Sequence, residues 1–310
     1  MLRGRIVKSV FWGICVFLLA FIIFNWANIK RLSTVNSLFN ADRIVHNFSN
    51  MDGAFFHKDL IASPTPFKWP ETLRDLPETV NINGSSQSLK ALLEDLDTTA
   101  LVIIKDGQLI HESYYQGTQR DDLRISWSVA KSFVSGLYGI ALEQGKIKSL
   151  DDKAVFYLPA LKGSAYEGVS LRDILNMASG VSFNEDYLDK NSDINKMGRV
   201  IALGGSMDDF AVSLKDRDFE AGTRWQYVSI DTHIAAMVLR EVMGKSLHDL
   251  FNDTYGAYLG FGRPPYYLTD GKSAAFALGG LNLRTRDYAK FGQLFLQQGI
   301  WQGRQIIPAD

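Results

Sequence analysis

The chain of 310 residues contains one cysteine, so it cannot form an intrachain disulfide. Its five histidines show none of the spacings that metal ligands adopt, and we therefore expect no metal site. No block of lysine and arginine stands out and the net charge is −1, which argues against nucleic acid as a partner. The sequence also lacks internal repeats and low-complexity tracts. We expect the protein to act without a metal ion or an organic cofactor.

The composition is that of a folded protein. Hydrophobic residues make up 46% of the chain and aromatic residues 12%, which is enough to bury a substantial core. The length suits an N-terminal anchor followed by one large two-lobed domain.

An apolar run from Val10 to Trp26, broken only by Asn25, follows three basic residues near the N-terminus. The run is at the short limit for crossing a bilayer as a helix, and Lys8 can lengthen it by snorkelling. No small-residue cleavage site follows it. We therefore interpret it as an uncleaved signal anchor, with a cleaved signal peptide as the alternative. The single cysteine, Cys15, is explained as a lipid-facing side chain of this run.

Charges on either side of the run predict its orientation. Three basic residues and the amino terminus precede it, whereas Lys30 and Arg31 follow, and this bias favours an N-terminus inside the cell. We expect residues 1–30 to form a single-pass anchor in a bacterial inner membrane, contacting lipid through residues 6–26. The rest of the chain would then face the periplasm or the cell exterior.

The tetrad Ser128-Val129-Ala130-Lys131 carries the first chemical signal. Apolar residues at helical spacing, followed by Gly145, predict a helix over 128–144 with Ser128 in its first turn. A spacing of three puts the hydroxyl of Ser128 and the amine of Lys131 on the same face, one turn apart. The unpaired backbone N–H and the positive end of the helix dipole favour an oxyanion on a carbonyl under attack. The pattern is that of a nucleophile beside its base.

Lys131 is flanked by apolar residues, which would partly desolvate it. Desolvation lowers the pKa of an amine and lets it accept the serine proton near neutral pH. Taken alone, however, a Ser-x-x-Lys pattern is weak, because about one is expected by chance in a chain of this size.

A second motif, Tyr227-Val228-Ser229, lies between a glycine turn at Gly222 and an apolar pattern that predicts a helix over 234–243. Tyr227 would therefore stand on a loop just before that helix. A phenol beside an ammonium group can shuttle protons between nucleophile and leaving group. Ser229 can hydrogen-bond the lysine or the leaving group. An ordinary half-buried aromatic is the structural alternative for Tyr227.

From about Asn47 to its last residue, the chain resembles the serine hydrolases of the class C β-lactamase and penicillin-recognising superfamily. Its resemblance is to the branch of 6-aminohexanoate-dimer hydrolases and related carboxylesterases. The segments that carry it, in order, are Ile125 to Ser132, Ser149 to Asp152, Gly163 to Val169, Met177 to Tyr187, Ala202 to Ser206, and Gly279 to Asn282 continuing through Arg286 to Gly292.

This resemblance implies roles for individual residues. Ser128 would be the acylated nucleophile, Lys131 the general base and Tyr227 the proton relay. Tyr187 matches a tyrosine that reaches over the site and binds the amide being cleaved. The alternative for Tyr187 is a loop aromatic on a hydrophilic segment.

One departure from the family concerns its third motif, a Lys/His-x-Gly sequence or a substitute for it. In the family this motif lies on an inner sheet strand after the Gly279-Gly280 segment, and its backbone N–H completes the oxyanion hole. The chain ends at Asp310, before that strand is expected, so we expect either a fragment or truncated product, or an oxyanion donor supplied from elsewhere. Losing one oxyanion donor costs on the order of a hundredfold in turnover. Two formal matches are rejected: Lys105-Asp106-Gly107 is a hairpin turn, and Trp301-Gln302-Gly303 is expected in a loop after a helix.

The resemblance implies an α+β fold of the β-lactamase/transpeptidase type, an antiparallel sheet flanked by helices plus a mostly helical lobe, with the C-terminal strands of the sheet missing. Residues 31–90, which hold four of the eight prolines, are expected to be a linker and surface segment, and 91–310 the hydrolase domain, with its helical lobe at about 150–265. Apolar runs at 98–105 and 108–115, joined by Asp106-Gly107, predict a hairpin that starts the sheet, and 285–297 predicts a helix.

Two hypotheses follow. The first is a membrane-anchored serine hydrolase that cleaves small amides or esters through an acyl-enzyme. The second is a catalytically silent binding or sensor protein that keeps the cleft but lacks the third motif. A membrane-tethered scaffold would explain the anchor but not the paired motifs.

Overall fold

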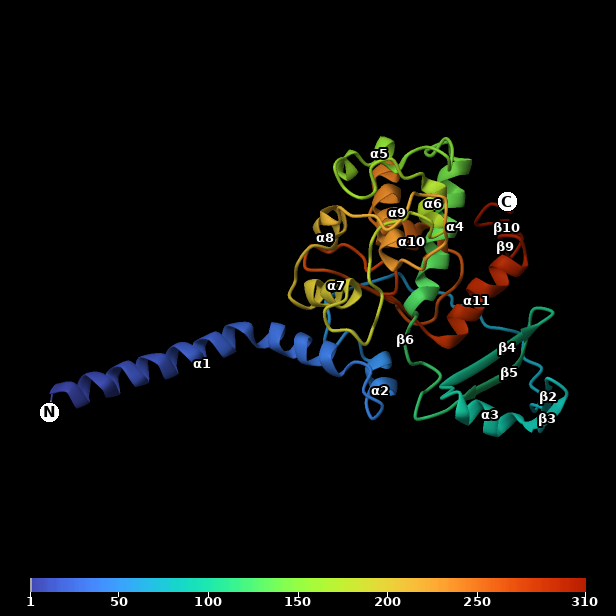
Figure 1. Ribbon diagram of the computed structural model, residues 1–310. Helices are drawn as coiled ribbons and strands as arrows, with labels where there is room; N and C mark the ends of the chain where they lie inside the picture. Colours follow the sequence, from blue (N-terminus) through green and yellow to red (C-terminus); the bar gives the residue numbers. More distant parts are fainter. Residues whose placement is uncertain (1) are drawn as a thin grey trace.

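The computed structural model describes residues 2–310, with side chains from residue 10 onward. A long helix, α1 (Leu2–Ser37), extends away from the folded domain, and α2 (Ile44–Ser49) lies where it joins that domain (Figure 1). An 18-residue window within Val10–Ser37 reaches a mean hydropathy of 2.3, and none of that window is buried. By length and composition this helix can cross a membrane, and a signal sequence would meet the same criteria.

The end of α1 is attached to the domain by its own basic residues. Lys30 Nζ donates a hydrogen bond to the carbonyl of Gly53 at 2.9 Å, and Arg31 Nε donates to the carbonyl of Ala202 at 2.8 Å. The helix therefore continues without a break from its apolar part into a contact with the domain.

Four short strands form the largest sheet, in the order β1-β7-β8-β6 and antiparallel throughout. They are β1 (His57–Asp59), β7 (Tyr266–Leu268), β8 (Leu281–Leu283) and β6 (Arg124–Ile125). The first of them belongs to the segment 31–90, expected to be a linker and surface segment. That segment also buries Leu60 and Trp69, so it packs into the domain.

The predicted hairpin is present as β4 (Ala100–Lys105) and β5 (Gln108–Tyr114). Its turn residues Asp106 and Gly107 have φ of 51° and 74°, the left-handed conformation that such a two-residue turn requires. The expectation that this hairpin starts the main sheet is wrong. It forms a two-stranded sheet of its own, and the outer edge of β5 hydrogen-bonds to the extended segment 70–74 instead of to a strand of the main sheet. It also follows another hairpin. The preceding hairpin is β2 (Thr79–Ile82) and β3 (Ser85–Ser88), followed by α3 (Leu89–Asp95).

Short helices fill the region between residues 150 and 265. They are α5 (Ala154–Tyr157), α6 (Leu171–Leu175), α7 (Asp193–Ala202), α8 (Met207–Ser213), α9 (Ser229–Met243) and α10 (Leu247–Phe251), with a 3₁₀ turn at Pro159–Leu161 and a π turn at Asn252–Gly256. Four of the helices begin with a serine whose hydroxyl accepts the backbone N–H three residues on: Ser170, Ser192, Ser206 and Ser246. Each such cap stabilises its helix by about 1 kcal/mol.

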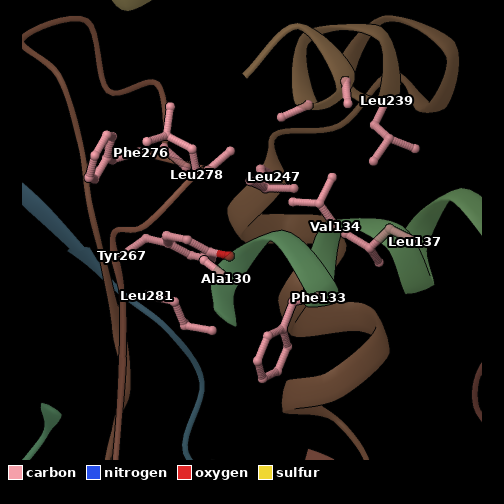
Figure 2. Close-up of a cluster of buried hydrophobic side chains, with 14 of the residues drawn as sticks. Ala130, Phe133, Val134, Leu137, Leu239, Leu247, Tyr267, Phe276, Leu278 and Leu281 are labelled. Carbon is pink, nitrogen blue, oxygen red and sulfur yellow. The ribbon is translucent and has the colours of Figure 1, made fainter. Parts of the chain in front are cut away.

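The core lies between α4 (Ala130–Glu143) and the elements around it. Figure 2 shows Val134 and Leu137 of α4 on the side of Leu239 and Leu247, Ala130 beside Tyr267 of β7, and Phe133 pointing away from both groups. The predicted helix at 285–297 is α11 (Thr285–Leu296), and its Phe291 stacks on Phe133 with ring centroids 3.6 Å apart. This packing fixes α4 against the sheet side of the molecule.

Residues 300–305 form a small hairpin, β9 (Ile300–Trp301) and β10 (Arg304–Gln305). The sequence predicted that Trp301-Gln302-Gly303 lies in a loop after a helix. In the structure this segment is instead part of the β9–β10 hairpin. Gln302 and Gly303 have φ of 49° and 77° and form its tight turn.

Candidate active site

Ser128 lies in a 3₁₀ turn, Trp127–Val129, that leads directly into α4 at Ala130. The predicted helix start at Ser128 is therefore correct in place but not in type, since the α-helix begins two residues later. Trp127, whose φ of 43° is left-handed, prevents the α-helix from extending upstream of Ser128. A bulky residue held in that conformation costs about 1–3 kcal/mol. The turn leaves Ser128 exposed at the N-terminal end of α4.

The side chain of Lys131 reaches back to this turn. Its Nζ lies 3.1 Å from Ser128 Oγ and donates a second hydrogen bond to the carbonyl of Leu278 at 2.8 Å. Leu278 precedes β8, so the sheet side of the molecule holds the amine in place. The predicted nucleophile and base are thus in hydrogen-bond contact.

Tyr227 approaches the same hydroxyl from the helical lobe. Its OH lies 2.7 Å from Ser128 Oγ, and the Nζ of Lys131 lies 5.3 Å from the centre of its ring. Tyr227 stands two residues before α9, on a loop, as its sequence context predicts. The three residues therefore meet at a single oxygen, Ser128 Oγ, although 99 residues separate Ser128 from Tyr227.

The electrostatics of the cluster suit proton transfer. Burial lowers the pKa of Lys131 below the usual value of 10.5, against the opposing influence of Tyr227 and Glu185. Burial by itself would raise the pKa of Tyr227, but hydrogen bonds from Ser128 and Lys131 and the lysine charge outweigh it, so the pKa is lowered. The pKa values of the lysine and the phenol are both closer to neutral pH than they are in water. Both groups can therefore exchange protons with Ser128.

Ser229 and Tyr187 meet at a carboxylate that sequence reasoning assigned no role, that of Glu185. Glu185 accepts hydrogen bonds from the backbone N–H of Ser229 at 2.7 Å and from the Ser229 hydroxyl. Tyr187 OH donates to the same carboxylate at 3.1 Å. Ser229 Oγ is thus bonded to Glu185, whereas the sequence suggested the lysine or the leaving group. Ser229 is buried, and Tyr187 is 53% exposed at the rim.

Burial, followed by the charge of Glu185, raises the pKa of Tyr187 to about 12, so this phenol stays protonated. A protonated phenol at the rim can donate a hydrogen bond to a substrate carbonyl or amide. Its position two residues before Tyr187 was the only feature of the sequence that could have indicated a role for Glu185. Its partner Ser229 lies 44 residues away, which no local pattern reveals.

A second carboxyl group, Asp231, lies fully buried behind the site on α9. Its Oδ1 accepts hydrogen bonds from Tyr166 OH at 2.6 Å and from Ser179 Oγ at 2.9 Å. Burial raises its pKa to about 7. Asp231 therefore ties α9 to the segment that leads to Glu185.

Within residues 2–310 as the structure describes them, no three His, Cys, Asp or Glu side chains are grouped to hold a metal ion. The side chains in contact at the cluster are those of a serine, a lysine and a tyrosine. A hydroxyl in contact with an amine of lowered pKa and a phenol of lowered pKa can attack an acyl carbon.

The family model described as "Beta-lactamase" matches residues 87–306. The chain belongs to the beta-lactamase family. The matched range includes Ser128, Lys131 and Tyr227, and the fold is the α+β arrangement that the sequence resemblance implied.

Three similar proteins refine this placement. The "6-aminohexanoate-dimer hydrolase" of Paenarthrobacter ureafaciens is 27% identical over 227 residues, which is 71% of this chain and 57% of that protein. The chain thus spans little more than half of this curated relative. Of the solved structures, "Putative 6-aminohexanoate-dimer hydrolase from Bacillus anthracis" superposes with a TM-score of 0.79 at 25% identity, covering 88% of this chain and 74% of the other. A class C beta-lactamase gives 0.51 at 19% identity, covering 68% and 63%, which supports the fold alone.

Proposed function

We propose that this protein is a membrane-anchored serine hydrolase that cleaves amide or ester bonds through an acyl-enzyme on Ser128. The observation that carries the proposal is the position of Ser128 Oγ, 3.1 Å from Lys131 Nζ and 2.7 Å from Tyr227 OH. A structural serine has no need of an amine and a phenol in simultaneous contact.

Acylation begins with Lys131 in its neutral form. The amine takes the proton of Ser128 as Oγ attacks the acyl carbon, and the tetrahedral intermediate carries the negative charge on the former carbonyl oxygen. The N-terminal end of α4 supplies a positive dipole beside that oxygen. Tyr227 then gives its proton to the leaving amine or alkoxide as the bond to the acyl carbon breaks, and Lys131 returns a proton to Tyr227. The products of this step are the acyl-enzyme and the free amine or alcohol.

Deacylation uses the same groups in reverse. A water molecule attacks the acyl carbon, its proton passes to the Tyr227–Lys131 pair, and Ser128 leaves with a proton restored to Oγ. Tyr187 at the rim is the residue proposed to hold the amide of the substrate.

The proposed substrates are small peptide-like amides, linear oligoamides or short-chain esters. The relative from Paenarthrobacter ureafaciens bears the name of a hydrolase of 6-aminohexanoate dimers, a linear amide, which supports this class. The family as a whole serves several chemistries, so the choice among amides and esters has to come from turnover measurements.

Fluorophosphonate labelling tests the nucleophile. We expect the full chain to be labelled, the Ser128→Ala variant to be unlabelled, and the Ser135→Ala variant, which removes another hydroxyl of α4, to be labelled like the wild type. Hydrolysis of p-nitrophenyl esters and linear amides should follow the same order. A folded full-length protein that takes no label and turns over none of these substrates would instead support a catalytically silent binding protein.

We propose a bacterial inner-membrane location, with α1 as a single-pass anchor and the domain in the periplasm or outside the cell. Support comes from the apolar window of α1, its lack of burial and the basic residues before it. After expression in a bacterium, alkaline carbonate should leave the protein in the membrane fraction, and added protease should digest the domain in spheroplasts. Release of a shortened soluble protein would favour a cleaved signal peptide.

A further inference from the structure

The segment that connects α1 to α2 and includes α2, residues 38–49, packs on the residue just before Ser128. The ring of Phe39 stacks on the indole of Trp127, with centroids 5.6 Å apart and planes 29° apart. The ring of Phe48 meets the same indole edge to face at 5.3 Å, and the two phenylalanines contact each other at 5.9 Å. Three aromatic rings thus form one cluster beside the nucleophile turn.

A polar attachment joins the same segment to the strand that leads into this turn. Arg124 of β6 donates two hydrogen bonds of 2.7 Å, to the carbonyl of Val45 and to Ser49 Oγ. The segment 38–49 is therefore attached at two places: to Arg124, three residues before the nucleophile turn, and to Trp127, the first residue of that turn.

Trp127 needs such support, because its left-handed φ of 43° is unfavourable for a bulky residue. The indole N–H is buried and finds no acceptor among the residues that the structure describes, so ring packing rather than a hydrogen bond holds the side chain. Gly279 also lies against this residue, since a Cβ there would be in van der Waals contact, 3.5 Å from the Trp127 Cα. Trp127 therefore packs on Gly279 as well as on the two phenylalanines.

We propose that Phe39 and Phe48 are positioning residues for the nucleophile: by holding Trp127 in its strained conformation they set Ser128 Oγ at hydrogen-bond distance from Lys131 and Tyr227. The proposal rests on the proposed role of Ser128. Neither phenylalanine has a reactive group, so they act through Trp127. Because residues 38–49 continue directly from α1, the N-terminal helix becomes part of the support of the active site as well as an anchor.

The test uses the full chain in detergent and the Phe39→Ala variant. Phe39 is 54% exposed, so its truncation leaves the core intact. We expect the rate of fluorophosphonate labelling and kcat for a p-nitrophenyl ester to fall about tenfold or more, with KM unchanged, since misplacement of a reacting atom by a fraction of an ångström has effects of this size. Phe39→Tyr keeps the stacked ring and should retain the wild-type rate.

The matched control is Phe156→Ala, the same change at a phenylalanine of α5 that is 72% exposed. It should alter neither rate. Phe48→Ala provides a second test, with thermal unfolding used to count only folded protein. Wild-type labelling rates in both folded Phe39→Ala and Phe48→Ala would overturn the proposal, as would a fall caused by Phe156→Ala of the same size. If the wild-type chain takes no label, Ser128 is not a nucleophile. That result would overturn the proposed function as well as this proposal.

Discussion

Glu185 accepts two hydrogen bonds from Ser229, one from its backbone N–H and one from its hydroxyl. Ser229 is the first residue of α9, so its N–H has no partner within the helix, and a carboxylate at that point is stabilised by the helix dipole. The contact joins the loop that carries Tyr187 to the helix that follows Tyr227. Tyr187 and Tyr227, which are far apart in sequence, are thereby connected through the contact between Glu185 and Ser229.

The lowered pKa of Lys131 predicts the pH dependence of turnover. The base works only when neutral, so kcat/KM should rise with pH through the pKa of Lys131, at a midpoint below the usual 10.5 of lysine. Lys131→Arg cannot lose its proton at these pH values and should reduce kcat by about 10²–10⁴-fold. Initial rates of ester hydrolysis across pH measure both effects. An unchanged profile in the arginine variant would exclude Lys131 as the base.

Glu185→Gln should move that profile. The charge of Glu185 raises the pKa of Lys131, so its removal lowers the pKa further and shifts the rise of kcat/KM to lower pH. Asp189→Asn removes a charge from the same loop, where the carboxylate bonds only the backbone N–H of Asn191 among the described residues, and serves as the control. A shift to higher pH in Glu185→Gln, or an equal shift in both variants, would contradict this electrostatic account.

Asp231 should make stability fall as pH rises. Its pKa of about 7 lies above the ordinary 3.8, so the folded state holds the proton more tightly than the unfolded chain does. The stabilisation is complete below pH 4 and lost as pH rises to about 7, a change of about 4 kcal/mol in the free energy of unfolding. Asp231→Asn keeps an acceptor for Tyr166 and Ser179 and should remove this decline, as followed by chemical denaturation at several pH values.

Asp208→Asn provides the opposite control for that measurement. Burial would raise the pKa of Asp208, but His233 and Arg240 outweigh it and lower the pKa to about 2. Its ionised form therefore stabilises the folded state above pH 4, and the asparagine variant should be less stable at neutral pH. Equal pH profiles for the wild type and Asp231→Asn would show that the pKa of Asp231 does not change on folding, and would contradict this prediction.

Phe133→Ala should destabilise the domain by about 3–5 kcal/mol, because it leaves a cavity in the core. Phe133 is fully buried and contacts the rings of Phe251, Tyr255 and Phe291. Denaturant unfolding should show the loss, while Phe156→Ala on the surface should change the free energy of unfolding by less than about 0.5 kcal/mol. Equal stability of the two variants would mean that α4 is not held by this cluster.

Much of the fold was predictable, because local rules act over a few residues. The Asp106-Gly107 turn, the helices near 130–143, 229–243 and 285–296, and the apolar helix at the N-terminus all follow from periodicity and turn chemistry. The isolation of the β4–β5 hairpin and the recruitment of β1 into the main sheet did not, since strand pairing depends on contacts between distant segments.

By itself, the sequence determined which groups are available for chemistry: a serine and a lysine one turn apart, a tyrosine ahead of a later helix, and an N-terminal helix apolar enough to span a bilayer. Only the tertiary structure decided how those groups meet. It brought Tyr227 to Ser128 across 99 residues, Glu185 to Ser229 across 44, and Phe39 onto Trp127. The reason is physical: spacing along a helix is set by local geometry, whereas contacts between distant segments are set by which surfaces pack together and exclude water.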